Sequence, residues 1–210
     1  MDIYASDEEK GEEIKQWWRD NGRSVILGCI VSAAIIFGGR YWMTYQQALA
    51  SNASVVYQQV VLSLNDDNIS SAEDKTQQLF SEFSSTPYAV FAAFEMAAQS
   101  VDTVSAQSYL EWVMAHADLL AHKELARLRL AQLLMNDEKF EQSLSLIEQS
   151  ESPAFSSLLS ELRGDILVAQ GNTHEARAAY QNAMLTLSQG EPRKQLLQVK
   201  LDDVAEFNAS

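Results

Sequence analysis

Cysteine is almost absent from this sequence of 210 residues, which contains only Cys29. A single thiol excludes a disulfide framework and a thiolate zinc site within one chain. The three histidines, His116, His122 and His174, are scattered and form no pair at the HExxH spacing that binds zinc on a helix. We therefore expect no metal ion and no cofactor, and we interpret the histidines as surface or core residues.

Basic residues are also few, with 15 lysines and arginines against 29 acidic residues and a formal net charge of −14. Binding to a phosphate backbone requires a basic stripe, and no basic cluster here is larger than Arg193-Lys194. This excludes the nucleic-acid-binding class. After Arg40 there are 22 acidic and 10 basic residues. Such a balance favours solubility and partners with basic surfaces.

Glycine and proline are nearly missing from the central part of the chain. No glycine occurs between Gly39 and Gly164, and the only prolines are Pro87, Pro153 and Pro192. This scarcity disfavours a β-fold rich in turns. Each proline follows a polar residue and stands where a helix can begin, so the prolines are expected to separate helices rather than interrupt them.

One uncharged run, residues 24–39, lies between Arg23 and Arg40 and continues into Tyr41-Trp42-Met43. About 20 apolar residues span the hydrocarbon layer of a bilayer, so the run predicts a transmembrane helix over residues 24–43. Arg40 is expected to extend towards the lipid headgroups. Aromatic residues flank both ends, as in interfacial belts: Trp17 and Trp18 precede the run, and Tyr41, Trp42 and Tyr45 follow it.

The basic residues around this run predict its orientation. Lys15, Arg19 and Arg23, together with Lys10, precede the run, whereas Arg40 alone follows it before residue 75. By the positive-inside rule the N-terminus is cytoplasmic. We therefore expect a short cytoplasmic segment at residues 1–23, an uncleaved signal anchor at 24–43 and an outer domain at 44–210.

Two other interpretations of the apolar run remain open. A cleaved signal peptide would use Ala48-Leu49-Ala50 as its cleavage site, but the acidic leader of residues 1–23 and the position of Arg40 are atypical of one. A buried core helix of a soluble protein also fits the length of the run. That interpretation leaves the aromatic flanks and the charge asymmetry unexplained.

Small residues within the run suggest that it packs against another membrane helix. Gly28 and Ser32 form a small-xxx-small pair, and Gly38 and Gly39 lie nearer the outer end. Small residues allow two helices to approach closely in lipid. We expect these four positions to contact a partner helix.

Apolar residues after the run recur at three- and four-residue steps, which predicts a series of short amphipathic helices. One such face is expected to include Tyr88, Phe91, Phe94, Ala98 and Val101. Two helices are expected after the proline at 153 and one after the proline at 192. Short breaks between short helices indicate antiparallel pairs that stack side by side. The other expected faces lie within residues 49–60, 79–83, 106–113, 125–134 and 140–147.

The chain contains an internal repeat with a period of 33 residues, close to the 34 of tetratricopeptide repeats. We expect Gly164 to let the second helix of its unit approach closely, and Ala176 to be the small contact on that helix. A third, weaker unit runs through Phe94, Ala97, Ala106 and Leu110. In the two clearest units Ala131, Leu134, Phe140, Ser143 and Ile147 align with Gly164, Leu167, Thr173, Ala176 and Tyr180.

Motifs of catalysis are missing: there is no glycine-rich phosphate loop, no GxSxG elbow and no cysteine nucleophile in the outer region. The sequence thus favours an all-α protein in which one transmembrane helix is followed by a tetratricopeptide-like solenoid. We expect it to have no catalytic residues and to present a surface to other proteins. An enzyme with an unmarked site is a less favoured alternative.

Together these features resemble the ancillary SecYEG translocon subunit family (YfgM-like), whose members are membrane-anchored tetratricopeptide-like proteins of Gram-negative bacteria. The resemblance runs nearly end to end. Two positions depart from the repeat consensus, since Ser143 stands where alanine is usual and neither unit begins with tryptophan. The matching residues are Ile3-Tyr4, Asn21-Gly22, Arg40-Tyr41-Trp42, Leu128-Arg129-Leu130-Ala131, Leu162-Arg163-Gly164-Asp165, Gly171 and Ala176-Arg177.

The resemblance implies a protein of the bacterial inner membrane whose outer domain is periplasmic. It implies association with the Sec translocon and with a membrane-anchored periplasmic peptidyl-prolyl isomerase. The expected role is chaperone-like assistance to exported, unfolded proteins. The alternative is a structural scaffold of an envelope complex that does not bind such proteins. Neither possibility identifies the residues that bind a client.

Overall fold

The computed structural model describes residues 7–150 and 152–206, and every regular element in these two stretches is a helix. This confirms the all-α prediction. The residues form two compact units, Met1–Ser51 and Asn52–Ser210. Ile3-Tyr4, which contributes to the family resemblance, lies outside the described residues.

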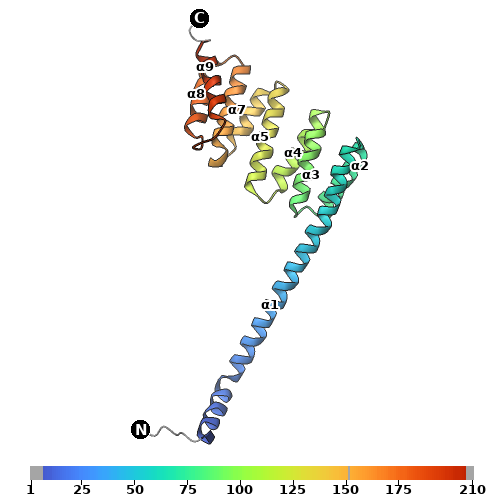
Figure 1. Cartoon of the computed structure of the whole chain (residues 1–210), viewed down its shortest axis with the longest axis vertical. Coiled ribbons are helices and arrows are strands. Elements are labelled where there is room, and N and C mark those ends of the chain that lie inside the picture. Colours follow the sequence, from blue (N-terminus) through green and yellow to red (C-terminus); the bar gives the residue numbers. More distant parts are fainter. Residues whose placement is uncertain (1–6, 151, 207–210) are drawn as a thin grey trace. The chain divides into compact units, whose positions relative to one another are not determined.

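The first helix, α1, extends without a break from Asp7 to Asn65 (Figure 1). It contains the whole expected membrane segment, and no change of secondary structure marks residue 24 or residue 43. Within the described residues it is the one helix long and apolar enough to cross a membrane, and only 6% of its most apolar stretch is buried. Leu27 and Phe37 are more than 60% exposed. Such exposure contradicts the alternative of a buried core helix and is compatible with membrane anchoring.

The second unit begins within α1, where Ala53, Val56 and Val60 are buried. Helix α2, Ile69–Glu82, starts at Asn68, whose side-chain oxygen accepts a hydrogen bond from the Ser71 N–H at 3.2 Å. Such a cap satisfies one of the free N–H groups of the first turn. Helix α3, Pro87–Gln99, has its proline in the first turn, where no N–H is needed.

Three further helices follow: α4, Thr103–His116; α5, Leu120–Asn136; and α6, Phe140–Glu148. Asp102 caps α4 by accepting the Ser105 N–H at 2.8 Å. Hydrogen bonds from Ser105 lower the pKa of the Asp102 carboxyl, so the cap is charged at neutral pH.

The last part of the chain contains a short 3₁₀ turn, Pro153–Phe155, and then α7, Ser156–Ala169; α8, Thr173–Leu185; and α9, Lys194–Glu206. Gly171 follows α7 with a φ of 81°, a left-handed conformation that glycine adopts without strain. The Asn172 N–H bonds back to the Leu167 carbonyl at 2.8 Å and closes the helix end.

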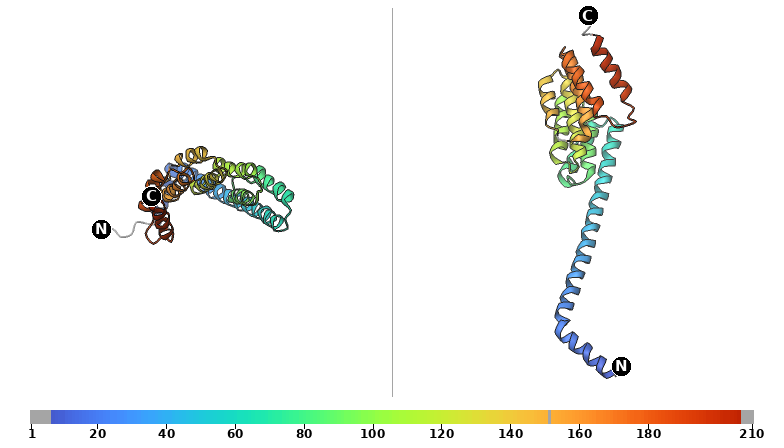
Figure 2. Two further views of the ribbon diagram at one scale, coloured as in Figure 1. Left: turned by 90° about the horizontal axis from the view of Figure 1, so that it is seen from above. Right: turned by 90° about the vertical axis from the view of Figure 1, so that its left-hand side faces the viewer.

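Successive helices of the second unit pack against their neighbours along the chain, from α2 on α3 to α8 on α9 (Figures 1 and 2). The additional contact of α5 with α7 joins one helix pair to the next. Three apolar clusters fill the spaces between pairs, centred on Val113 between α3, α4 and α5, on Ile166 between α5, α6 and α7, and on Ala183 between α7, α8 and α9. This arrangement confirms the stacked helix pairs of a tetratricopeptide-like domain.

The expected apolar face of α3 is partly wrong. Phe94 is buried, but Phe91 is 38% exposed and the helix ends at Gln99, before the fully exposed Val101. The buried side of α3 instead includes Ala89, Val90 and Ala93. Aromatic residues at three-residue spacing do not distinguish a covered helix face from an uncovered one.

The two clearest repeat units correspond to α5 with α6 and to α7 with α8. Ser143 is fully buried, and its hydroxyl donates a 2.6 Å hydrogen bond to the carbonyl of Ala131. In the second unit Gly164 lies against the ring of Tyr180, and a Cβ on Gly164 would lie 2.8 Å from the ring carbon Cζ. Ile147 occupies the position equivalent to Tyr180, and Ala131 the position equivalent to Gly164. The larger side chain of the two, Tyr180, therefore packs against glycine, and the smaller one, Ile147, stands opposite alanine.

Candidate interaction surface

An aromatic row crosses three helices of the second unit. It consists of Tyr57 on α1, Tyr88 and Phe91 on α3, and His122 on α5. The ring centroids of Tyr57 and Tyr88 are 5.8 Å apart, those of Tyr57 and Phe91 are 6.2 Å apart, and those of Phe91 and His122 are 5.8 Å apart. Phe91 meets both Tyr88 and His122 edge to face, an arrangement that stabilises aromatic pairs beyond their buried area.

One ring of the aromatic row, that of Phe91, is exposed, and the other three are half-buried. On α3 the neighbouring Val90 and Phe94 are buried in the core, which fixes the helix, while Phe91 is exposed. Burial and the nearby carboxylate of Glu95 both raise the pKa of Tyr57, so its hydroxyl is neutral at physiological pH. The row is thus an apolar surface with a neutral hydroxyl and with a carboxylate close to Tyr57.

A small hollow of about 210 Å³ adjoins this row and shares His122 with it. Pro87 and Val90 from α3 and Leu119 from the loop before α5 form its apolar walls. Leu119 is 59% exposed. The row and the hollow together offer apolar contacts to an extended or helical segment of another protein.

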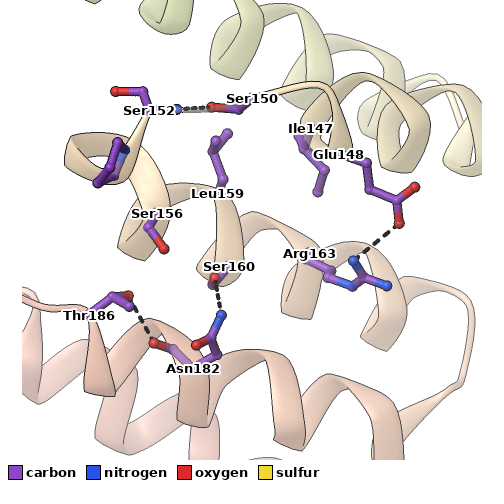
Figure 3. Close-up of a pocket in the computed structure, with 11 residues that line it drawn as sticks. Ile147, Glu148, Ser150, Ser152, Ser156, Leu159, Ser160, Arg163, Asn182 and Thr186 are labelled. Carbon is purple, nitrogen blue, oxygen red and sulfur yellow. Dashed lines mark hydrogen bonds and ion pairs between the residues drawn. The ribbon is translucent and has the colours of Figure 1, made fainter.

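A groove with a volume of about 680 Å³ lies between α6, α7 and α8 (Figure 3). Arg163 of α7 pairs with Glu148 of α6 at 3.1 Å, and the Asn182 amide donates to the Ser160 hydroxyl at 2.9 Å. Polar groups across this groove therefore satisfy one another. The aromatic row differs from this groove in that an aromatic side chain, Phe91, is exposed there.

Helix α9 is fastened to α7 by a compact charged cluster. The Lys200 ammonium lies 2.9 Å from Glu161 and 2.7 Å from Asp165, and the Arg193 guanidinium lies 2.7 Å from Glu161. The Tyr180 hydroxyl donates to Asp165 at 2.8 Å. This cluster and the buried Leu197 and Val204 close the end of the stack.

The residues expected to pack the repeats lie in the interior of the second unit. Phe140 is half-buried, and the others are buried. Those expected to act in the membrane lie on α1, where Lys15, Arg19 and Arg23 are exposed. Ala131, Leu134, Phe140 and Ser143 contribute to one repeat unit, and Gly164, Leu167, Ala176 and Tyr180 contribute to the next.

Three of the four expected membrane-packing residues share one face of α1. Gly28, Ser32 and Gly39 are separated by four and seven residues, whereas Gly38 lies about 100° around the helix from Gly39. A Cβ at Gly28, Gly38 or Gly39 would meet no atom within 4 Å. The packing of this face against a partner helix stays a prediction.

Sequence reasoning missed the aromatic row. It treated Tyr88 and Phe91 as core residues and His122 as a scattered histidine, and it did not single out Tyr57. The only sequence signal was that aromatic residues of α3 stand beside alanines. Which of the two sides is exposed became clear only once the neighbours of α3 were known. Among the described residues no group of three or more His, Cys, Asp or Glu side chains is arranged to hold a metal ion.

Comparison with known proteins places these features in context. The family model of the tetratricopeptide repeat-like domain matches residues 15–206. The ancillary SecYEG translocon subunit of Haemophilus influenzae is 27% identical over 97% of this chain and 100% of its own length. The proteins of the same name from Escherichia coli and Neisseria gonorrhoeae are each 26% identical, over 86% and 97% of this chain and 88% and 100% of their own lengths. No solved structure matches the chain.

Proposed function

Because the chain belongs to the tetratricopeptide repeat-like domain family and its relatives are named ancillary SecYEG translocon subunits, we propose that it is a non-catalytic, membrane-anchored ancillary subunit of the Sec translocon. The long apolar helix α1 supports anchoring in the bacterial inner membrane. Anchoring raises the effective concentration of the second unit near the translocon, so weak contacts suffice for function.

The second unit assists exported proteins on the periplasmic side by binding their apolar segments. The observation that carries this proposal is the aromatic row, in which Phe91 is exposed while its neighbours on α3 are buried. Exported chains are unfolded when they emerge and display apolar side chains, which aromatic rings bind with little loss of side-chain entropy. A membrane-anchored peptidyl-prolyl isomerase is a second proposed partner, which rests on the family resemblance alone.

This proposal predicts that translocating chains contact the aromatic row. A photoreactive amino acid at Phe91 of the full-length protein, activated while an exported protein is held in the translocon, should form adducts with that protein. The same probe at Gln181, an exposed residue of α8 outside the row, is the matched control. We expect the yield at Phe91 to exceed that at Gln181 by about tenfold, the ratio that corresponds to about 1.4 kcal/mol of preferential contact.

Equal yields at the two positions would contradict client binding at the row. If neither position captures an exported chain while the protein still co-purifies with translocon subunits, the scaffold alternative is favoured. Substitution of Phe91 by serine should then leave export unchanged. If the row does bind clients, Phe91→Ser should weaken their capture. The protein should stay folded, because Phe91 is exposed.

The proposed orientation places the N-terminus in the cytoplasm and the second unit in the periplasm. It rests on Lys15, Arg19 and Arg23 before the apolar stretch. Alkaline phosphatase, which is active only outside the cytoplasm, should be active when fused after Ser210. A cytoplasmic reporter at the same position should be inactive, and the reverse pattern of activities would refute the orientation.

A further inference from the structure

A second groove, of about 390 Å³, lies between α4 and α6 above α5. Its floor is apolar and consists of Leu130 and Leu134 from α5 and Leu146 from α6. We call it the acidic groove, because its two charged lining residues, Glu111 and Glu141, are both acidic. Its remaining lining residues are the neutral polar residues Gln107, Gln142, Ser145 and Gln149.

Both carboxylates are exposed, and their hydrogen bonds within the described part of the chain come from neutral amides. Gln107 donates to Glu111 at 2.7 Å, and Gln170 donates to Glu141 at 3.4 Å. Neither glutamate takes part in an ion pair within residues 7–150 and 152–206. Their negative charge is therefore available to a partner.

The groove between α6, α7 and α8 has a different charge arrangement. There Arg163 neutralises Glu148. The residue 33 positions before Arg163 is Leu130, which is part of the apolar floor of the acidic groove. At this repeat position the groove beside α8 therefore has a cation that pairs with its carboxylate, whereas the acidic groove has an apolar leucine.

The two helices that flank the acidic groove, α4 and α6, contain three acidic residues and no lysine or arginine, whereas α5 below it contains one acidic and three basic residues. The two sets of alternate helices contain equal numbers of acidic residues but different numbers of basic ones. Helices α3, α5, α7 and α9 contain seven acidic and six basic residues, and the basic ones are Lys123, Arg127, Arg129, Arg163, Lys194 and Lys200. Helices α2, α4, α6 and α8 contain seven acidic residues but two basic ones, Lys75 and Arg177.

We propose that the acidic groove docks a basic amphipathic segment of a partner protein. An apolar side chain of that segment occupies the space above Leu130, Leu134 and Leu146, and flanking lysines or arginines pair with Glu111 and Glu141. Apolar burial supplies the affinity, and the negative field of α4 and α6 selects and orients the basic segment. The acidic groove shares no residue with the aromatic row, so a client on the row and a partner in the groove do not compete for the same side chains.

The test uses the full-length protein in nanodiscs of uncharged lipid and a fluorescent helix-forming peptide. The peptide has about 15 residues, leucine on one face and lysine on the other. A twin peptide with glutamate in place of lysine controls for apolar binding, and empty nanodiscs control for binding to lipid. Fluorescence anisotropy should show binding of the lysine peptide that weakens as salt increases, because salt screens exposed charges. Equal binding of the glutamate twin would overturn the proposal.

Two variants test the position of the site. The Glu111→Gln/Glu141→Gln protein should bind the lysine peptide about fivefold more weakly, the range expected for losing two exposed ion pairs. Glu82→Gln/Glu175→Gln removes the same charge from α2 and α8, outside the groove, and should change affinity less than about twofold. Equal losses in the two variants would show that only net charge matters and would refute a defined site.

A third variant, Ser145→Arg, places a cation at the exposed rim without altering the core. It should abolish binding of the lysine peptide while the thermal unfolding of the protein stays the same. Full binding by this variant would refute docking in the groove. Photocrosslinking at Phe91 should be unaffected by Ser145→Arg, so failure of the groove proposal and failure of the client proposal are distinguishable.

Discussion

Substitution of Gly164 by alanine should reduce the free energy of unfolding of the second unit by about 2 kcal/mol. On an open helix surface the same change stabilises by up to about 1 kcal/mol, because alanine is the better helix former. At Gly164 the new Cβ would overlap the ring of Tyr180, with Cζ at 2.8 Å and Cδ1 and Cε1 closer still. The ring has little freedom to move, since it is 97% buried and its hydroxyl is bonded to Asp165. Circular dichroism of the full-length protein during chemical unfolding in mild detergent measures the change.

Two controls separate the overlap from other effects of this substitution. Gly11→Ala introduces the same methyl group on α1, where no atom lies within 4 Å, and should not destabilise the protein. In a Tyr180→Leu background the alanine at 164 should cost less than in the native protein, which a double-mutant cycle reports as a coupling energy. A Gly164→Ala protein as stable as the native one would contradict the close packing of α7 and α8.

Removal of the Glu161 carboxylate should release α9 from the stack. Glu161→Ala takes one ion-pair partner from each of Arg193 and Lys200, whose side chains are only 24% and 23% exposed. Breaking a buried pair destabilises strongly, and we expect a loss of about 2 kcal/mol here because the cluster is partly open to solvent. Hydrogen exchange of the α9 amides in the full-length protein should accelerate roughly thirtyfold, while exchange in α3 to α6 stays unchanged.

The matched control for this prediction is Arg163→Ala, which removes the exposed pair with Glu148 and should change stability by less than about 0.5 kcal/mol. Similar exchange of α9 in the two variants would contradict a stabilising role for the charged cluster.

The contribution of the charged cluster to stability also depends on pH. Burial lowers the pKa of Lys200, but its hydrogen bonds to Asp165 and Glu161 outweigh this effect and raise the pKa above the ordinary 10.5.

The direction of this pKa shift determines the pH range in which the Lys200 interactions stabilise α9. A raised lysine pKa contributes stability that is complete below the unfolded value and disappears as pH rises through the folded value. Protection of α9, corrected for the intrinsic exchange rate, should therefore be constant near neutral pH and decrease above about pH 10.5. The Glu161→Ala variant should lose part of this dependence.

Much of the fold was predictable from local sequence features. The prolines at 87 and 153 stand in the first turns of helical segments, and Gly171 follows α7 in the left-handed conformation. The 33-residue offset correctly predicted two consecutive helix pairs. These features act within one or two helical turns, so a single sequence contains the information needed to recognise them.

The interaction surfaces were less predictable. The aromatic row combines residues 57, 88, 91 and 122, and the acidic groove combines residues from α4, α5 and α6. Apolar periodicity identified Phe91 as one of a helical set but placed it in the core. Each helix of a stack has neighbours on two sides, and periodicity does not report how much of its surface each neighbour covers.

By itself, then, the sequence determined that this protein is helical, that it contains one apolar helix long enough to span a membrane, and that its remaining helices form repeated pairs. Spacing, turn residues and charge are local properties, and they are sufficient for those conclusions. Only the tertiary structure decided that Gly164 accommodates Tyr180, that Lys200 reaches α7, and that Phe91 and the groove beside Glu111 remain open. Those properties depend on contacts between residues up to 39 positions apart, which form only when the helices stack.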